Sequence, residues 1–177
     1  MKIVESNGGP LIAMHMRDLA QWSGIDALSF FKNRSSAETD YDALCQIGMD
    51  NPYQVIDVAR GDNIDILLIA IPIPTIIVEA TEGHIYLAQI ETSEDGWSKS
   101  ELRASDFATP AEWRDPLHVS FQAGTIIFFD SACVLSDLRD SEVLAAHVEE
   151  GRYLCEWSRQ DWEGKAQMYF IRMVRDM

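Results

Sequence analysis

The sequence predicts a mainly β protein of the α+β class, in which hairpins build antiparallel sheets and two to four short helices complete the fold. Two observations predict this class. Short runs rich in β-branched and aromatic residues recur between Gly-containing turns, and the strand–helix alternation of a parallel sheet is absent. No linker rich in Gly, Ser or Pro divides the sequence, so we expect a single domain over residues 1–177.

Two short extended runs open the chain, residues 2–6 and residues 11–15. A Gly-Gly-Pro step lies between them. Glycine adopts positive φ easily and proline lacks a backbone donor. We therefore expect Gly8, Gly9 and Pro10 to be a structural motif, a turn that pairs the two runs as a hairpin.

Two short helices are expected next. Residues 16–22 form the first, which ends at Gly24. Residues 41–47 form the second, with Thr39 or Asp40 as its N-terminal cap.

The middle of the chain predicts two more hairpins. Residues 53–59 pair with residues 64–71, and residues 75–79 pair with residues 84–90, because a turn that contains Gly separates each pair of apolar runs. The polar segment 94–113 has no sustained period, so we expect a long surface loop with one short helix.

The last third predicts a hairpin of residues 117–121 and 125–130 and a final hairpin of residues 152–158 and 166–174. Residues 166–174 place large apolar side chains on both faces of the predicted strand, which indicates that the strand is covered on both sides. Between these hairpins, residues 140–150 have helical spacing. Val143, Leu144, His147 and Val148 would share one face of that helix, and Gly151 follows its end.

The chain is strongly acidic. It has 29 Asp and Glu against 14 Lys and Arg, a formal net charge of −15, and the excess is spread over both halves of the sequence. Such a field repels phosphate backbones and anionic lipid surfaces, so we expect no direct nucleic-acid or membrane ligand. A basic protein partner would be attracted. Solubility alone would also explain an acidic surface.

Cysteine usage and apolar patterning indicate a cytoplasmic protein. Cys45, Cys133 and Cys155 are an odd number at irregular spacing, which does not suit a disulfide framework or a zinc site. No apolar signal segment follows Lys2. The longest apolar stretch, residues 64–78, is interrupted and too short to span a membrane, so it predicts buried strands.

The sequence contains no phosphate-binding glycine loop, zinc-protease motif or nucleophile elbow. Its histidines are far apart in sequence: His15, His84, His118 and His147. We therefore expect no catalytic residue, no metal site and no cofactor. Asp130, at the end of an apolar run, suits either a catalytic carboxylate or a turn cap, and the cap is favoured.

Two sets of residues are candidates for binding a partner. Trp97 and Trp162 lie in a polar segment and at a predicted turn, and tryptophan is enriched in protein interfaces. Acidic residues also gather on and around the predicted helix 140–150, although a solvated helix face would look the same. These acidic candidates are Asp140, Glu142, Glu149 and Glu150.

Five short segments carry a family resemblance. They are residues 4–12 (VESNGGPLI), 22–24 (WSG), 39–45 (TDYDALC), 129–132 (FDSA) and 151–153 (GRY). Together they resemble the motifs of the immunity protein 21 family of bacterial polymorphic toxin systems, which begin with an ESxGGP-type motif, an apolar pair and a tryptophan segment. Residues 64–94 carry no such motif.

The resemblance implies a mostly β immunity protein that is encoded beside a toxin, neutralises it by protein–protein contact and has no catalytic residues. The charge suits this role independently, because toxin domains that act on nucleic acid are basic. The alternative is a non-catalytic interaction or regulatory module with another partner. An enzyme that uses Asp130 with a nearby histidine is the least favoured function.

Overall fold

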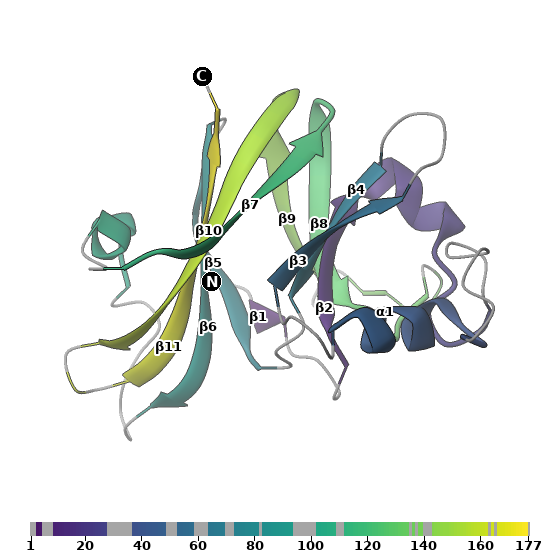
Figure 1. Ribbon diagram of the computed structural model, residues 1–177, viewed down its shortest axis with the longest axis horizontal. Helices are drawn as coiled ribbons and strands as arrows, with labels where there is room; N and C mark the ends of the chain where they lie inside the picture. The colour runs from purple at the N-terminus through teal and green to yellow at the C-terminus, as the bar shows by residue number, and fades with distance from the viewer. Residues whose placement is uncertain are drawn as a thin grey trace.

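The computed structural model describes residues 3–4, 9–27, 37–48, 53–58, 64–69, 73–81, 83–93, 102–108, 112–134, 136, 138–139, 143–162, 164 and 166–176. Their strands form two antiparallel sheets that face each other (Figure 1). The six-stranded sheet consists, in spatial order, of β1 (Ile3–Val4), β5 (Thr75–Ala80), β6 (His84–Ser93), β11 (Ala166–Arg175), β10 (Gly151–Trp162) and β7 (Arg114–Phe121). The five-stranded sheet consists of β3 (Tyr53–Val58), β4 (Ile64–Ile69), β2 (Leu11–His15), β8 (Gly124–Asp130) and β9 (Leu144–Val148).

The main apolar core lies between the two sheets. Phe128 and Tyr153 are among its largest fully buried side chains, and Val119, Ile85 and Ile171 belong to the same cluster. Each sheet contributes alternate residues to this core, because successive side chains of a strand point to opposite faces. The predicted mainly β class is confirmed.

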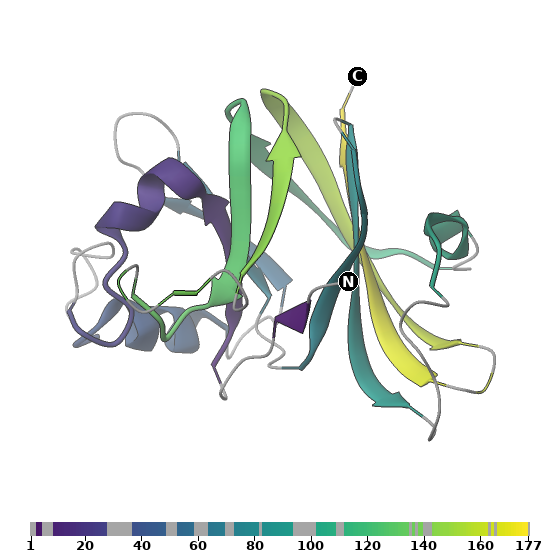
Figure 2. The same ribbon diagram turned by 180° about the vertical axis from the view of Figure 1, so that it is seen from behind.

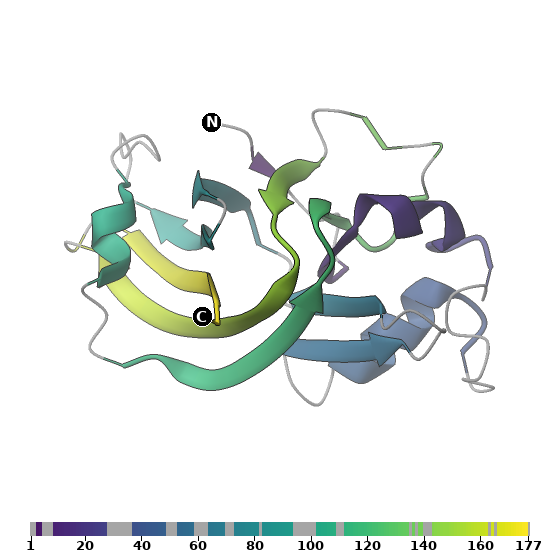
Figure 3. The same cartoon turned by 90° about the horizontal axis from the view of Figure 1, so that it is seen from above.

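Helical segments cover the outer faces of the sheets. The short 3-10 helix η1 (Met16–Gln21) and helix α1 (Asp40–Gly48) pack on the five-stranded sheet, with Trp22, Leu44 and Phe129 in one buried cluster. The 3-10 helix η3 (Ala104–Ala108) covers the six-stranded sheet at the opposite end of the molecule, as Figures 2 and 3 show.

The ring of Phe107 in η3 stacks on Tyr86 and Phe170, with centroid distances of 4.8 and 4.4 Å. The buried face that contains Phe170 also contains Met168, whereas Ile171 and Met173 of β11 point into the core between the sheets. The prediction that this strand is covered on both sides is therefore confirmed. The segment 94–113 contains a short helix, η3, as predicted, but η3 is not simply on the surface, because its Phe107 is only 1% exposed.

Local signals predicted several elements correctly. Strand β2, helix α1 and the hairpins β3–β4, β5–β6 and β10–β11 all lie where the sequence predicts them. Thr39 caps α1, since its Oγ1 accepts a hydrogen bond from the backbone N–H of Asp42 at 3.0 Å.

Two predicted hairpins are wrong, because their strands separate into different sheets. β1 pairs with β5, whereas β2 pairs with β4 and β8. Likewise β7 pairs with β10, whereas β8 pairs with β2 and β9. The first four residues of β2 are all fully buried, so this strand needs neighbours along both edges and packing on both faces, which a hairpin with the two residues of β1 cannot supply.

The helix predicted over residues 140–150 is also wrong for the residues described. Leu144–Val148 is strand β9, in which Leu144, Ala146 and Val148 are buried while Ala145 and His147 are exposed. The apolar residues there fit a period of two as well as a helical period. Pairing with the edge of β8 decides between the two.

Candidate functional site

The predicted partner-binding residues are only partly covered by the structure. Trp97, Asp140 and Glu142 lie outside the described residues, as does Gly8. Trp162 ends β10 and pairs with Ala166, and its side chain is outside the described part. The role of Trp97, Trp162, Asp140 and Glu142 in partner binding therefore remains a prediction.

Glu149 and Glu150 lie in the turn between β9 and β10 rather than on a helix. Arg175 forms an ion pair with the Glu149 carboxylate and donates a hydrogen bond to the Glu150 carbonyl. The Tyr153 hydroxyl donates to the Glu149 carbonyl oxygen at 3.1 Å and lies 3.2 Å from the Glu149 backbone nitrogen, as an acceptor would. These contacts give a structural role to the turn and to the GRY motif, which follows the turn and begins β10.

The other four sequence motifs converge beside the start of α1. They meet where β8 ends, on the outer side of the five-stranded sheet. We call this group the motif cluster. Its members are Gly9, Pro10, Trp22, Ser23, Gly24, Asp40, Tyr41, Cys45, Asp130, Ser131 and Ala132.

Backbone hydrogen bonds hold the motif cluster together. Ser131 is central: its N–H donates to the Pro10 carbonyl at 3.0 Å, and its own carbonyl accepts from the Trp22 indole at 3.1 Å. The N–H of Tyr41 donates to the Gly24 carbonyl at 3.0 Å. These bonds connect segments far apart in the sequence, so the motifs position one another.

Two buried carboxylates complete these connections. Asp40 is fully buried and accepts a hydrogen bond from the Ser23 N–H at 3.1 Å. Asp130 is 4% exposed and accepts from the Ala132 N–H at 2.9 Å, so the favoured role as a turn cap is confirmed. Each carboxylate therefore satisfies a backbone N–H donor within the cluster.

Close packing explains the glycines of the cluster. A Cβ on Gly9 would collide with the ring of Tyr41. Gly24 has φ of +51°, and a Cβ there would lie 2.6 Å from the Ala132 carbonyl oxygen. Glycine is needed at both positions because the neighbouring chain passes so close. Gly9 therefore has a structural role through close packing, whereas the predicted hairpin turn is not formed and Gly9 does not have positive φ.

Two side chains of the cluster, Tyr41 and Cys45, have raised pKa values and favour their neutral forms. A hydrogen bond to Cys45, followed by burial, raises the pKa of Tyr41 to about 12, and the Asp130 carboxylate acts in the same direction. Burial raises the pKa of the Cys45 thiol. A thiol held in its protonated form is a poor nucleophile.

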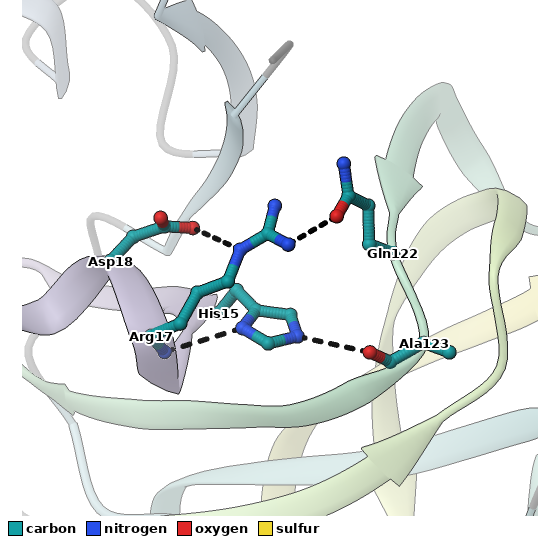
Figure 4. Close-up of polar contacts among 5 residues, drawn as sticks. All are labelled: His15, Arg17, Asp18, Gln122 and Ala123. Carbon is teal, nitrogen blue, oxygen red and sulfur yellow. Dashed lines mark hydrogen bonds and ion pairs between the residues drawn. The ribbon is translucent and has the colours of Figure 1, made fainter.

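A second polar group lies where η1 meets the turn between β7 and β8 (Figure 4). His15 Nδ1 is 3.3 Å from the Arg17 backbone N–H, and His15 Nε2 is 3.4 Å from the Ala123 carbonyl oxygen. A neutral ring protonated on Nε2 fits both contacts. The Arg17 guanidinium donates to Gln122 and lies 3.6 Å from Asp18. This group ties η1 to the adjoining turn.

A third group lies on the face of the six-stranded sheet that is turned toward the five-stranded sheet. We call it the aromatic–arginine surface, made of Arg114, Trp157, Arg159 and Tyr169. The Trp157 and Tyr169 rings lie 5.9 Å apart and are only partly buried at the margin of the core. The Arg114 guanidinium lies 5.7 Å from the Trp157 ring, and that of Arg159 lies 5.9 Å from the Tyr169 ring.

A pocket adjoins Trp157 at the line where β4 approaches the six-stranded sheet. Leu67 and Ile69 form its wall on the side of β4, and Leu117 and Ile171 form part of the opposite wall. The lining is therefore largely apolar. Sequence reasoning missed this region. A signal was available, because the final hairpin places Arg159 directly opposite Tyr169.

Within the described ranges, no three His, Cys, Asp or Glu side chains gather closely enough to hold a metal ion. None of the helices in those same ranges is long and apolar enough to cross a membrane.

Comparisons with known proteins give one match. The family described as immunity protein 21 matches residues 2–161. Curated proteins and solved structures gave no match. The matched range contains the motif cluster and the GRY motif, which agrees with the resemblance carried by the five motifs. The chain belongs to the immunity protein 21 family.

Proposed function

We propose that this protein binds a cognate toxin of a polymorphic toxin system in the cytoplasm and neutralises it by protein–protein contact, without catalysing a reaction. The family match over residues 2–161 carries the proposal. It covers most of the 177 residues, including the five-stranded sheet and all of the six-stranded sheet except β11 and the last residue of β10.

The charge of the chain supports a basic toxin as the partner. A net charge of −15 accelerates the encounter with a basic surface and disfavours one with nucleic acid. Toxin domains that act on nucleic acid must carry such a basic surface. An acidic inhibitor can occupy it in place of the polyanion.

Co-expression tests the proposal. The toxin domain encoded beside this gene is induced in a host with and without the protein, and survival is scored. We expect growth only when the protein is present, together with a complex that co-purifies from the surviving cells. A folded acidic protein of similar net charge is the control, because it separates specific neutralisation from a charge effect.

The outcomes separate the functions considered. Death despite abundant folded protein contradicts neutralisation. A stable complex without survival supports the alternative, a non-catalytic interaction module. Survival without a complex, together with chemical change of the toxin, would indicate an enzyme.

A further inference from the structure

Ion pairing is unevenly distributed over the acidic residues that the structure describes. At the end of the molecule formed by η1 and α1, the side chains of Asp26, Glu38 and Asp42 form no ion pair with any other described residue. Their negative charge is therefore not balanced by a neighbouring arginine or lysine in that part of the chain. By contrast, five acidic residues on or beside the six-stranded sheet have an arginine partner, namely Glu91, Glu112, Glu149, Glu156 and Asp176.

The three unbalanced carboxylates adjoin one junction of the backbone. The N–H of Tyr41 donates to the Gly24 carbonyl, and the N–H of Asp40 donates to the Ala27 carbonyl, both at 3.0 Å. Asp26 lies in the turn between the two acceptors, and the other two acidic residues flank the two donors in the chain. Figures 1 and 3 show the segment that follows η1 beside the start of α1, at the end of the molecule away from the six-stranded sheet.

An exposed apolar side chain accompanies these carboxylates. Ile25 precedes Asp26 in the turn and is 57% exposed, and the only other large apolar side chains exposed among the described residues are Met16 and Val174. Protein interfaces commonly combine apolar contacts with a polar rim. We call this group the acidic end surface, which consists of Ile25, Asp26, Glu38 and Asp42.

The buried motif cluster holds the acidic end surface in place. The Asp40 carboxylate accepts a hydrogen bond from the Ser23 N–H at 3.1 Å, and the backbone of Gly24 packs closely against the chain at the end of β8. Two of the five family motifs, residues 22–24 and 39–45, therefore adjoin this surface or contribute to it. A surface that is ordered before binding loses less conformational entropy when a partner docks. This gives the buried motifs a role in recognition, as the support of an exposed surface.

Charge decides which partner fits this surface. Residues 16–27 and 37–48 contain five acidic residues and one basic residue, Arg17, within a chain of net charge −15. A second copy of the chain would present the same negative charge and be repelled. A basic protein would be attracted over long range and would supply the missing positive charges on contact.

We propose that the acidic end surface is the docking surface for a basic toxin domain, whose lysine or arginine side chains pair with Asp26, Glu38 and Asp42 while an apolar group covers Ile25. This inference rests on the proposed function. It goes further by placing the contact at the helical end of the molecule, away from the turn that contains Glu149 and Glu150.

A charge-neutralisation experiment separates contact from attraction at a distance. The variant Asp26→Asn/Glu38→Gln/Asp42→Asn changes the net charge from −15 to −12, because each substitution removes one negative charge. The control Glu91→Gln/Glu112→Gln/Glu150→Gln makes the same change in charge at exposed residues on or beside the six-stranded sheet. Thermal unfolding shows whether each variant folds like the wild type.

Surface plasmon resonance with the neighbouring toxin domain, inactivated in its own active site, measures both rates. Both variants should associate more slowly than the wild type, because they lose the same long-range charge. The acidic end variant should also dissociate at least about tenfold faster, whereas the control should stay within about twofold, since changes at an interface act mainly on dissociation. Equal dissociation of the two variants overturns the docking surface.

An uncharged pair of variants tests the apolar part of the contact. Ile25 and Met16 are equally exposed, at 57%, but only Ile25 belongs to the acidic end surface. Ile25→Ala should speed dissociation at least about fivefold, whereas Met16→Ala should leave it within about twofold. The same rate for both variants would remove Ile25 from the contact.

Carboxyl footprinting of the wild-type complex needs no substitution. Carbodiimide coupling of glycine ethyl ester labels exposed carboxylates, and toxin binding should suppress the labelling of Asp26, Glu38 and Asp42. Glu112, whose side chain is 78% exposed, should keep its reactivity. Unchanged labelling of the three carboxylates in a saturated complex overturns the inference even if the variants fold poorly.

The two proposals fail differently. A wild-type protein that neither binds nor neutralises the toxin ends the proposed function, and this inference with it. A wild-type protein that binds normally while the acidic end variant matches its control ends only the docking surface. Protection of the three carboxylates without toxin, increasing with protein concentration, would make this a self-association surface and overturn its assignment to the toxin.

Discussion

The indole Nε1 of Trp22 donates a hydrogen bond to the carbonyl oxygen of Ser131 at 3.1 Å, across 109 positions of sequence. The same indole packs edge-on against Phe129, with ring centroids 6.4 Å apart. Trp22 and Ser131 are both almost completely buried. The bond therefore links the segment after η1 to the end of β8 where water cannot replace it.

Loss of this bond should destabilise the fold. Trp22→Phe keeps an aromatic ring against Phe129 but leaves the Ser131 carbonyl without its indole donor. Urea unfolding should show a loss of about 1–3 kcal/mol. Ser131→Ala is the matched control, because the Ser131 hydroxyl is buried and has no partner among the described residues. Its removal should be neutral or stabilising, and a loss as large as that of Trp22→Phe would contradict this explanation.

Gly9 and Tyr41 should be energetically coupled. Gly9→Ala places a methyl group against the Tyr41 ring, and we expect a cost of about 1–3 kcal/mol from overpacking. In a Tyr41→Ala background the same substitution should cost little, because the collision partner is gone. A double-mutant cycle by chemical denaturation measures the coupling, and purely additive effects would contradict it.

Gly24 and Gly164 form a matched pair for separating backbone strain from collision. Both have positive φ, +51° and +71°. A Cβ on Gly24 would meet carbonyl oxygens of Ala132 and Cys133 at 2.6 and 2.7 Å, whereas none of the described atoms lies within 4 Å of a Cβ on Gly164. Gly164→Ala should cost about 1–2 kcal/mol from strain alone. Gly24→Ala should cost about 1–3 kcal/mol more, and thermal unfolding that ranks the two equally would contradict the collision.

Alkaline pH should weaken the fold. Burial raises the pKa of the Cys155 thiol, and a hydrogen bond to Cys45 together with burial raises the pKa of Tyr41 to about 12. Since these pKa values are higher in the folded state, the protonated groups contribute their full stability below the unfolded thiol pKa of about 8.5. This stability is lost as the pH rises through the pKa values of the folded state. For Cys155, the slope is at most about 1.4 kcal/mol per pH unit. Urea unfolding between pH 7 and pH 10, compared with Cys155→Val, measures this. Parallel curves for the two proteins would contradict it.

Salt should slow association with the toxin. A chain of net charge −15 attracts a basic domain over long range, and dissolved ions screen that attraction. Stopped-flow mixing at about 50 and 500 mM salt should show association at least about tenfold slower at the higher concentration, with dissociation changing far less. An association rate that does not depend on salt would mean that charge does not drive recognition.

The sequence by itself determined the elements whose signals are local. The hairpin β10–β11 follows from two apolar runs around one tight turn, and Thr39 caps α1 with its own hydroxyl. The facing of Arg159 and Tyr169 also follows from this hairpin, because the pairing of Trp162 with Ala166 fixes the register back along the two strands. Each of these depends on residues close to one another in the chain.

Tertiary structure alone decided which sheet each strand joins. Leu144–Val148 has no strong local preference, and the free edge of β8 makes it a strand. β7 and β8 follow one another in sequence yet enter different sheets, since each finds its partners far along the chain. The meeting of Gly9, Trp22, Tyr41 and Ser131 has the same origin. Apolar burial and backbone hydrogen bonding must be satisfied over the whole molecule at once. The sheet that each strand joins therefore cannot be predicted from any local stretch of sequence.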